Sequence, residues 1–124
     1  MNKLLIIDDE PDITEIFDLL GNYLGYTAET INSGKKALEK LGKMDRSYNA
    51  VFCDLKMPGI DGLQIYNFVS GLDPEFSRRF VLLTGAILDQ NVEKEINLKN
   101  IMVLKKPFAI DEIKKAIEII ERRQ

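Results

Sequence analysis

The sequence predicts an α/β protein in which a five-stranded parallel sheet carries helices on both faces. Short aliphatic runs alternate five times with amphipathic stretches along the 124 residues, and this alternation is typical of βαβ units. The runs are aliphatic at nearly every position, as expected for strands buried on both faces. A chain of this length has room for one compact domain, and we assign residues 1–124 to it.

The five strands are placed on the aliphatic runs, and the helices on apolar residues at helical spacing between them. The predicted strands cover residues 3–7, 26–30, 49–53, 80–84 and 101–104. Pro11 suits the first turn of the first helix, which Gly25 ends. Ser33 and Asp61 are candidate N-caps of the second and third helices. The residues expected on the inner faces are Ile13, Ile16, Phe17, Leu20 and Leu24 in the first helix, Ala37, Leu38 and Leu41 in the second, Leu63, Ile65, Tyr66 and Val69 in the third, and Ile110, Ile113, Ala116, Ile117 and Ile120 in the fifth.

The fourth helix should be the least firmly anchored one. Its apolar stripe consists of Leu88, Val92 and Ile96 among acidic and basic residues. The polar segment from Asp73 to Glu75 is expected to lead through Arg78 and Arg79 into the fourth strand.

Composition excludes several classes of function. The net charge of −3 argues against a nucleic-acid partner. The longest aliphatic runs have four residues, whereas a spanning helix needs about 20, so we expect no membrane segment. The first of these runs is also too short for a secretion signal, which predicts a cytoplasmic chain. With one cysteine, Cys53, and no histidine, the chain has no internal disulfide, thiolate metal cage, histidine-ligated zinc or histidine-activated nucleophile.

Charged and hydroxyl side chains stand where predicted strands end. Asp8 and Asp9 follow the first strand, Asp54 the third, Thr84 ends the fourth, and Lys106 follows the fifth. In a parallel α/β sheet, functional groups collect beyond the carboxyl ends of the strands. Converging carboxylates repel one another unless a cation lies between them, and an all-oxygen ligand set suits Mg²⁺. Taken singly, each residue more often serves as a cap, a turn residue or a solvated lysine; their coincidence predicts a magnesium and phosphate pocket.

Four segments resemble the receiver domain of bacterial two-component response regulators. They are residues 6–10 (IIDDE), 53–62 (CDLKMPGIDG), 83–86 (LTGA) and 105–108 (KKPF), and the resemblance covers essentially the whole chain. It implies a flavodoxin-like sheet with strand order 2-1-3-4-5.

The resemblance also implies a role for each site residue. Asp54 would be the phosphoacceptor, taking a phosphoryl group from a sensor histidine kinase, a phosphotransfer protein or a small phosphodonor. Asp9 would bind Mg²⁺ directly and Asp8 through a water, with Asp54 and the backbone carbonyl of Lys56 as further ligands. The domain would catalyse its own phosphorylation and dephosphorylation and would otherwise not be an enzyme.

The phosphoryl group would itself be held by two further side chains. Lys106 would pair with one phosphoryl oxygen, and Thr84 would donate its hydroxyl to another. The Lys106–Pro107 peptide bond is expected to be cis.

Phosphorylation would switch the surface formed by the fourth helix, the fifth strand and the fifth helix, and so control a downstream protein or a phosphorylation-linked dimer. Receivers usually carry Tyr or Phe where this chain has Val103, and that aromatic ring turns inward as the threonine moves. The chain lacks this ring, so the switch must work differently or more weakly. Val103 can equally be a well-packed strand residue. Lys56 and Ala86 would flank the path of the water that removes the phosphoryl group. Since alanine offers no base, we expect slow to moderate self-dephosphorylation.

Two other functions are compatible with an α/β fold of this kind. A constitutive, non-phosphorylated docking module would need none of the five site residues, yet Asp8, Asp9, Asp54, Thr84 and Lys106 are all present. An aspartyl phosphatase or phosphotransferase of another α/β class would have two aspartates two positions apart at the end of the first strand. Asp8 and Asp9 are adjacent and do not have this spacing. The chain is either a free-standing receiver or part of a larger regulator or hybrid kinase, and the start at Met1 favours the former.

Overall fold

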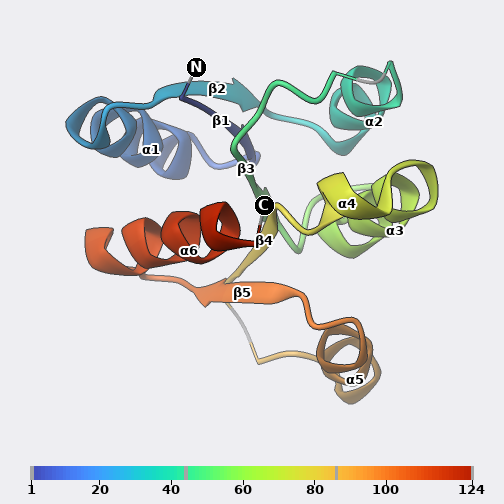
Figure 1. Cartoon of the computed structure of the whole chain (residues 1–124). Coiled ribbons are helices and arrows are strands. Elements are labelled where there is room, and N and C mark those ends of the chain that lie inside the picture. Colours follow the sequence, from blue (N-terminus) through green and yellow to red (C-terminus); the bar gives the residue numbers. More distant parts are fainter. Residues whose placement is uncertain (1, 44, 86, 124) are drawn as a thin grey trace.

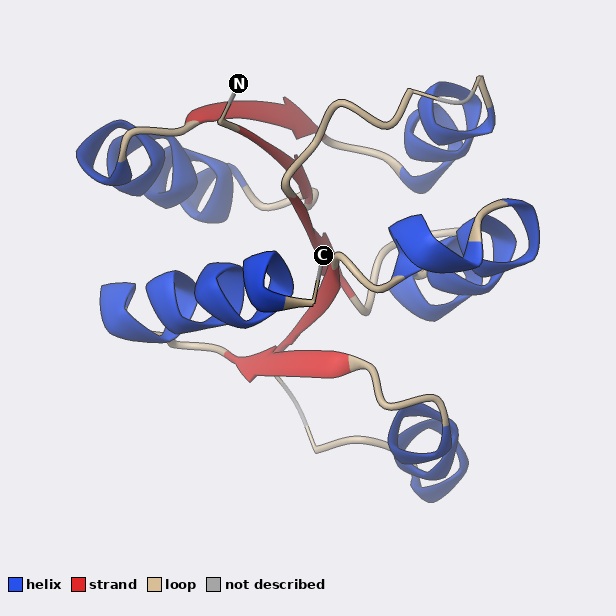
Figure 2. Ribbon diagram, in the orientation of Figure 1, coloured by secondary structure: helices blue, strands red, loops and turns tan. Residues whose placement is uncertain are grey.

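The chain folds into a five-stranded parallel sheet between two layers of helices (Figures 1 and 2). A computed structural model describes residues 2–43, 45–85 and 87–123. In chain order, the elements are β1 (Lys3–Ile7), α1 (Pro11–Leu24), β2 (Thr27–Ile31), α2 (Gly34–Gly42), β3 (Ala50–Asp54), α3 (Gly62–Leu72), α4 (Pro74–Ser77), β4 (Phe80–Thr84), α5 (Gln90–Leu98), β5 (Met102–Lys105) and α6 (Ile110–Arg122).

The strand order is β2-β1-β3-β4-β5, with all neighbouring pairs parallel, which confirms the predicted doubly wound topology. In the register of the two central strands, Ile7 lies opposite Cys53. The residues that follow them, Asp8 and Asp54, therefore reach the same edge of the sheet at the same level. This pairing of β1 with β3 brings the acidic residues together.

The two faces of the sheet have separate hydrophobic cores. Helices α1 and α6 cover one face, and α2, α3, α4 and α5 cover the other (Figure 1). Because side chains alternate along a strand, Leu4 and Ile6 enter the core under α1 and α6, whereas Leu5 and Ile7 enter the opposite core. In the first core the ring of Phe17 lies 4.9 Å from that of Phe52.

The predicted helix caps are confirmed. Ser33 Oγ accepts a hydrogen bond from the amide of Lys36, at 3.2 Å. Asp61 and Gln64 form a reciprocal capping box at the start of α3. Gly25 ends α1 at φ 84°, a left-handed conformation that glycine adopts without steric cost.

Three details differ from the prediction. Strands β2, β3 and β5 each begin and end one residue later than expected, so that Asp54 belongs to β3. Between Asp73 and β4, the chain forms the short helix α4 instead of a link, because the Asp73 carboxylate caps the Phe76 amide and Pro74 suits the first turn. Ile16, expected on the inner face of α1, is 41% exposed, because it lies about 100° around the helix from the buried Phe17.

The thin apolar stripe predicted for the fourth helix is also observed. In α5, Ile96 is buried, while Val92 and the preceding Leu88 are half-buried against the core. No helix within the described residues is long and apolar enough to cross a membrane.

Candidate functional site

Three buried polar side chains gather at the carboxyl edge of the sheet, whereas a fourth, Ser77, lies in α4. Asp8, Asp54 and Thr84 are at most 5% exposed. Asp8 directly follows β1, Asp54 is the last residue of β3, and Thr84 is the last residue of β4. The order β1-β3-β4 makes these strand ends neighbours. The sheet therefore assembles in one place residues that are 76 positions apart in the sequence, as the strand-end argument predicted.

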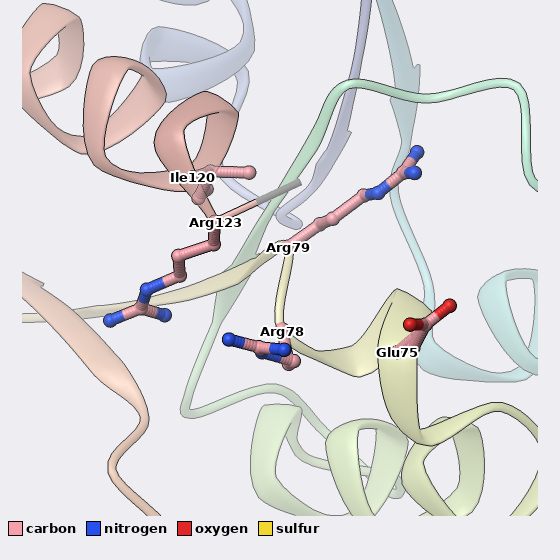
Figure 3. A pocket seen from close by; sticks show the side chains of 5 residues that line it. All are labelled: Glu75, Arg78, Arg79, Ile120 and Arg123. Atoms are coloured by element: carbon pink, nitrogen blue, oxygen red, sulfur yellow. The ribbon is translucent and has the colours of Figure 1, made fainter.

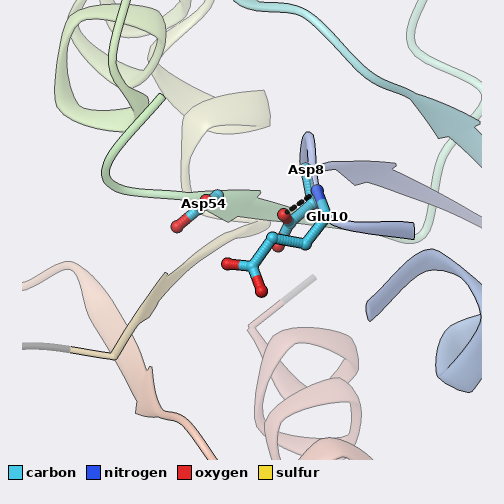
Figure 4. Close-up of side chains that lie close together, drawn as sticks. All are labelled: Asp8, Glu10 and Asp54. Atoms are coloured by element: carbon cyan, nitrogen blue, oxygen red, sulfur yellow. Dashed lines mark hydrogen bonds between the residues drawn. The ribbon is translucent and has the colours of Figure 1, made fainter. Parts of the chain in front are cut away.

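Three carboxylates converge at this edge (Figure 4). One oxygen each from Asp8, Glu10 and Asp54 lies within 4.8 Å of the other two. The third member is thus Glu10, which the sequence reasoning did not single out. Asp9 is exposed and lines the same cavity as Asp8 and Glu10. The acidic run Asp8-Asp9-Glu10 was the only signal for Glu10, because the direction of a side chain in a loop does not follow from its spacing.

Lys106 is the basic partner of all three carboxylates. Its Nζ lies 3.1 Å from Glu10 Oε1, 3.2 Å from Asp8 Oδ2 and 3.6 Å from Asp54 Oδ1. The lysine amide donates to the carbonyl of Thr84 at 2.7 Å, which fixes the loop after β5 to the end of β4. The Lys106–Pro107 bond is cis, as expected. The ammonium group therefore lies among the three carboxylates.

The remaining predicted site residues are Lys56, Val103 and Ala86, of which the first two lie outside the group of carboxylates around Lys106. The amide of Lys56 donates to Asp54 Oδ1 at 3.4 Å, while its side chain is exposed. Val103 is half-buried and packs against the same core as Ile96, so the reading of a packed strand valine fits the structure. Ala86 lies outside the described residues.

Burial and mutual repulsion perturb the acidic groups. Burial, and secondly the charge of Asp8, raise the pKa of Asp54 from 3.8 to about 6, against the opposing effect of Lys106. Burial also raises the pKa of Asp8, although the Glu10 amide bonds its carboxylate at 2.9 Å. For Lys106, burial lowers the pKa, but the Glu10 hydrogen bond and the charges of Asp54 and Asp8 raise it further, so that the net shift is upward. Burial thus opposes the ionisation of Asp8 and Asp54, while their negative charges favour the ammonium form of Lys106.

The donor set fits a hard divalent cation. Asp8 Oδ2 is fully buried and accepts no hydrogen bond, although Lys106 Nζ contacts it at 3.2 Å. A buried carboxylate oxygen without a hydrogen-bond partner is unfavourable, and a cation would satisfy it. The nearby oxygens of Asp54 and Glu10 are the ligands that Mg²⁺ prefers.

A second cavity lies at the opposite end of the sheet, where Glu75, Arg78, Arg79, Ile120 and Arg123 line it (Figure 3). The guanidinium groups of Arg79 and Arg123 point away from each other in this view. Arg79 donates to the backbone carbonyl of Tyr48 at 2.7 Å. Arg79 and Arg123 therefore do not converge on one anion.

Comparisons with known proteins agree with this geometry. A family model described as the response regulator receiver domain matches residues 4–118. The chain is 31% identical to the transcriptional regulatory protein CpxR homolog of Haemophilus influenzae, over 99% of this chain and 52% of that protein. It is 28% identical to the sporulation initiation phosphotransferase F of Bacillus subtilis, over 94% of this chain and 90% of that protein.

The fold is shared with solved receiver structures. A response regulator receiver domain protein from Clostridium thermocellum superimposes with a TM-score of 0.83 at 25% identity, over 99% of this chain and 96% of that one. The chain spans about half the length of the first curated relatives it matches, 52% and 46% of them. The family match extends over more than nine tenths of the chain and includes every predicted site residue, so the chain belongs to the response regulator receiver domain family of two-component systems.

Proposed function

We propose that this domain accepts a phosphoryl group on Asp54 and transmits the change to a partner protein. The observation that carries the proposal is the environment of Asp54: a buried carboxylate at the end of β3, 3.6 Å from the Lys106 ammonium, with two further carboxylates within 4.8 Å. Asp54 has a pKa of about 6, so it is mainly ionised at neutral pH and can act as a nucleophile.

In the proposed reaction, an oxygen of Asp54 forms a bond to phosphorus while the bond from phosphorus to the donor's leaving group breaks. Lys106 pairs with a phosphoryl oxygen, and the Thr84 hydroxyl donates to another. Asp8, Asp9 and Asp54 would hold the metal, together with the backbone carbonyl of Lys56. Bound Mg²⁺ would supply positive charge to the phosphoryl oxygens in the transition state. The donor is a phosphohistidine on a sensor histidine kinase or a phosphotransfer protein, and Mg²⁺ is the cofactor.

The output surface is the one formed by α5, β5 and α6, which are the fourth helix, fifth strand and fifth helix of the sequence prediction. Support for it comes from the loop after β4, which connects Thr84 to α5. Movement of Thr84 towards a phosphoryl group would shift this loop. The weak anchoring of α5, with only Ile96 buried in it, would let the helix follow. With Val103 on β5, the movement would proceed without a rotating aromatic ring, and Lys56 and Ala86 would set the lifetime of the phosphoryl group.

The test is the intact mass of the protein after incubation with acetyl phosphate, with and without Mg²⁺. We expect one phosphoryl adduct that requires Mg²⁺ and is absent in Asp54→Asn. Asp12→Asn is the matched control, because Asp12 is an exposed aspartate in the first turn of α1 and should leave the adduct intact. An adduct that persists in Asp54→Asn would refute the assignment of the acceptor. No adduct from either acetyl phosphate or a kinase would favour the constitutive docking module.

A further inference from the structure

Lys106 distributes its contacts unequally among the three carboxylates. Its Nζ forms a hydrogen bond to Glu10 Oε1 at 3.1 Å. The contact with Asp8 Oδ2 is an ion pair in which that oxygen accepts no hydrogen bond, and Asp54 Oδ1 is the most distant of the three, at 3.6 Å. The lysine therefore lies between Glu10 and Asp8 and is more distant from the proposed acceptor.

The three carboxylates also differ in their freedom to move. Asp8 and Asp54 are buried, and backbone amides hold them at 2.9 Å and 3.4 Å. The side chain of Glu10 is longer and 58% exposed, so it can release the lysine into solvent. Solvent also weakens this pair relative to a buried one, since exposed ion pairs contribute little.

We propose that Glu10 is a positioning residue that retains the Lys106 ammonium in the unphosphorylated protein, so that a phosphoryl group on Asp54 must compete with Glu10 for the lysine. This inference rests on the proposed function and deepens it. A phosphoryl oxygen beside Asp54 would attract the ammonium group away from Glu10 Oε1, so that the two acceptors compete for the N–H donors of Nζ. Glu10 thereby opposes the phosphorylated state.

Glu10 should act on the metal in the opposite direction. Its carboxylate lies within 4.8 Å of oxygens of Asp8 and Asp54, so its negative charge favours a cation at the cluster. Loss of that charge should weaken the binding of Mg²⁺ and strengthen the binding of a phosphoryl group. A residue with only a structural role would weaken both when it is replaced.

The experiment measures two dissociation constants by amide NMR titration: that of Mg²⁺ alone, and that of beryllofluoride, as a phosphoryl analogue, at saturating Mg²⁺. For Glu10→Gln we expect a change of about two- to fivefold in each, since the pair is partly exposed. Mg²⁺ should bind more weakly and beryllofluoride more tightly. Asp12→Asn removes an equal charge from the same region and should leave the beryllofluoride constant unchanged.

Glu10→Asp separates retention of the lysine from simple charge repulsion. It keeps the negative charge but shortens the side chain by one methylene, which takes the carboxylate out of hydrogen-bonding distance of Nζ. We expect Glu10→Asp to bind beryllofluoride as tightly as Glu10→Gln does, with the Mg²⁺ affinity of the wild type. If Glu10→Asp binds beryllofluoride like the wild type, the effect of Glu10 is only repulsion and the inference is wrong.

Two further outcomes distinguish the inference from the proposed function. If the wild type binds beryllofluoride and Glu10→Gln binds it equally or more weakly, the inference fails while the proposed function stands. If the wild type binds Mg²⁺ but no variant binds beryllofluoride, the proposed acceptor site fails and the inference fails with it.

Discussion

Replacement of Asp54 by asparagine should stabilise the metal-free protein at neutral pH. The variant retains the size of the side chain and removes a charge that burial and Asp8 make unfavourable. The pKa of Asp54 is raised from 3.8 to about 6, and one pH unit corresponds to about 1.4 kcal/mol. The charged form thus costs up to about 3 kcal/mol in the folded state at pH 7. We expect Asp54→Asn to raise the free energy of unfolding by about 1–3 kcal/mol, as the neutral amide also loses the attraction of Lys106.

The sign of the pH dependence follows from the direction of the shift. Because the folded-state pKa of Asp54 lies above its unfolded value, the native state binds the proton more tightly. The contribution of Asp54 protonation to the free energy of unfolding is fully present below about pH 4 and is lost as the pH rises through about 6. The advantage of Asp54→Asn over the wild type should therefore be small near pH 4 and full near pH 7.

Urea unfolding followed by circular dichroism, in the presence of a chelator, measures this difference at both pH values. Asp12→Asn serves as the control for a change of net charge and should alter stability by less than about 0.5 kcal/mol. An Asp54→Asn protein that is no more stable than the wild type at pH 7, or whose advantage is as large at pH 4, would refute the argument from repulsion.

Two further predictions concern the same edge of the sheet. Mg²⁺ at about ten times its dissociation constant should add about 1.4 kcal/mol to the free energy of unfolding of the wild type. Asp8→Asn should stabilise the metal-free protein and lose most of this Mg²⁺ effect. Calorimetric melting with and without Mg²⁺ measures both effects, and equal Mg²⁺ shifts of the melting temperature in the two proteins would contradict a cation at Asp8. Gly62→Ala should destabilise the protein by about 2–4 kcal/mol, because a Cβ there would clash with the backbone of Asp54 and Leu55. Gly71→Ala is its control, since no atom lies within 4 Å of a Cβ at that position, and equal unfolding midpoints for the two variants would show that the loop can move aside.

Much of this fold is readable from local sequence patterns. Aliphatic runs and helical spacing predict all five strands and all the longer helices, because a strand buried on both faces has few polar positions. The caps at Ser33 and Asp61 are local chemistry and were predicted. The short helix α4 was missed because one turn carries no periodicity, and only the Asp73-Pro74 pair marks its start.

The candidate site, like the fold, was predicted in part from the sequence and decided in part by the tertiary structure. That acidic residues stand after β1 and at the end of β3, with a lysine after β5, is decided by the sequence alone. Which of them meet was decided by the tertiary structure, through the pairing of β1 with β3 and the loop that returns Lys106 to this edge. Strand spacing predicts the positions of Asp8 and Asp54 because a strand has a fixed period. Beyond Ile7 the chain leaves the strand and that period ends, so only the packed loop decides that Glu10 reaches Lys106.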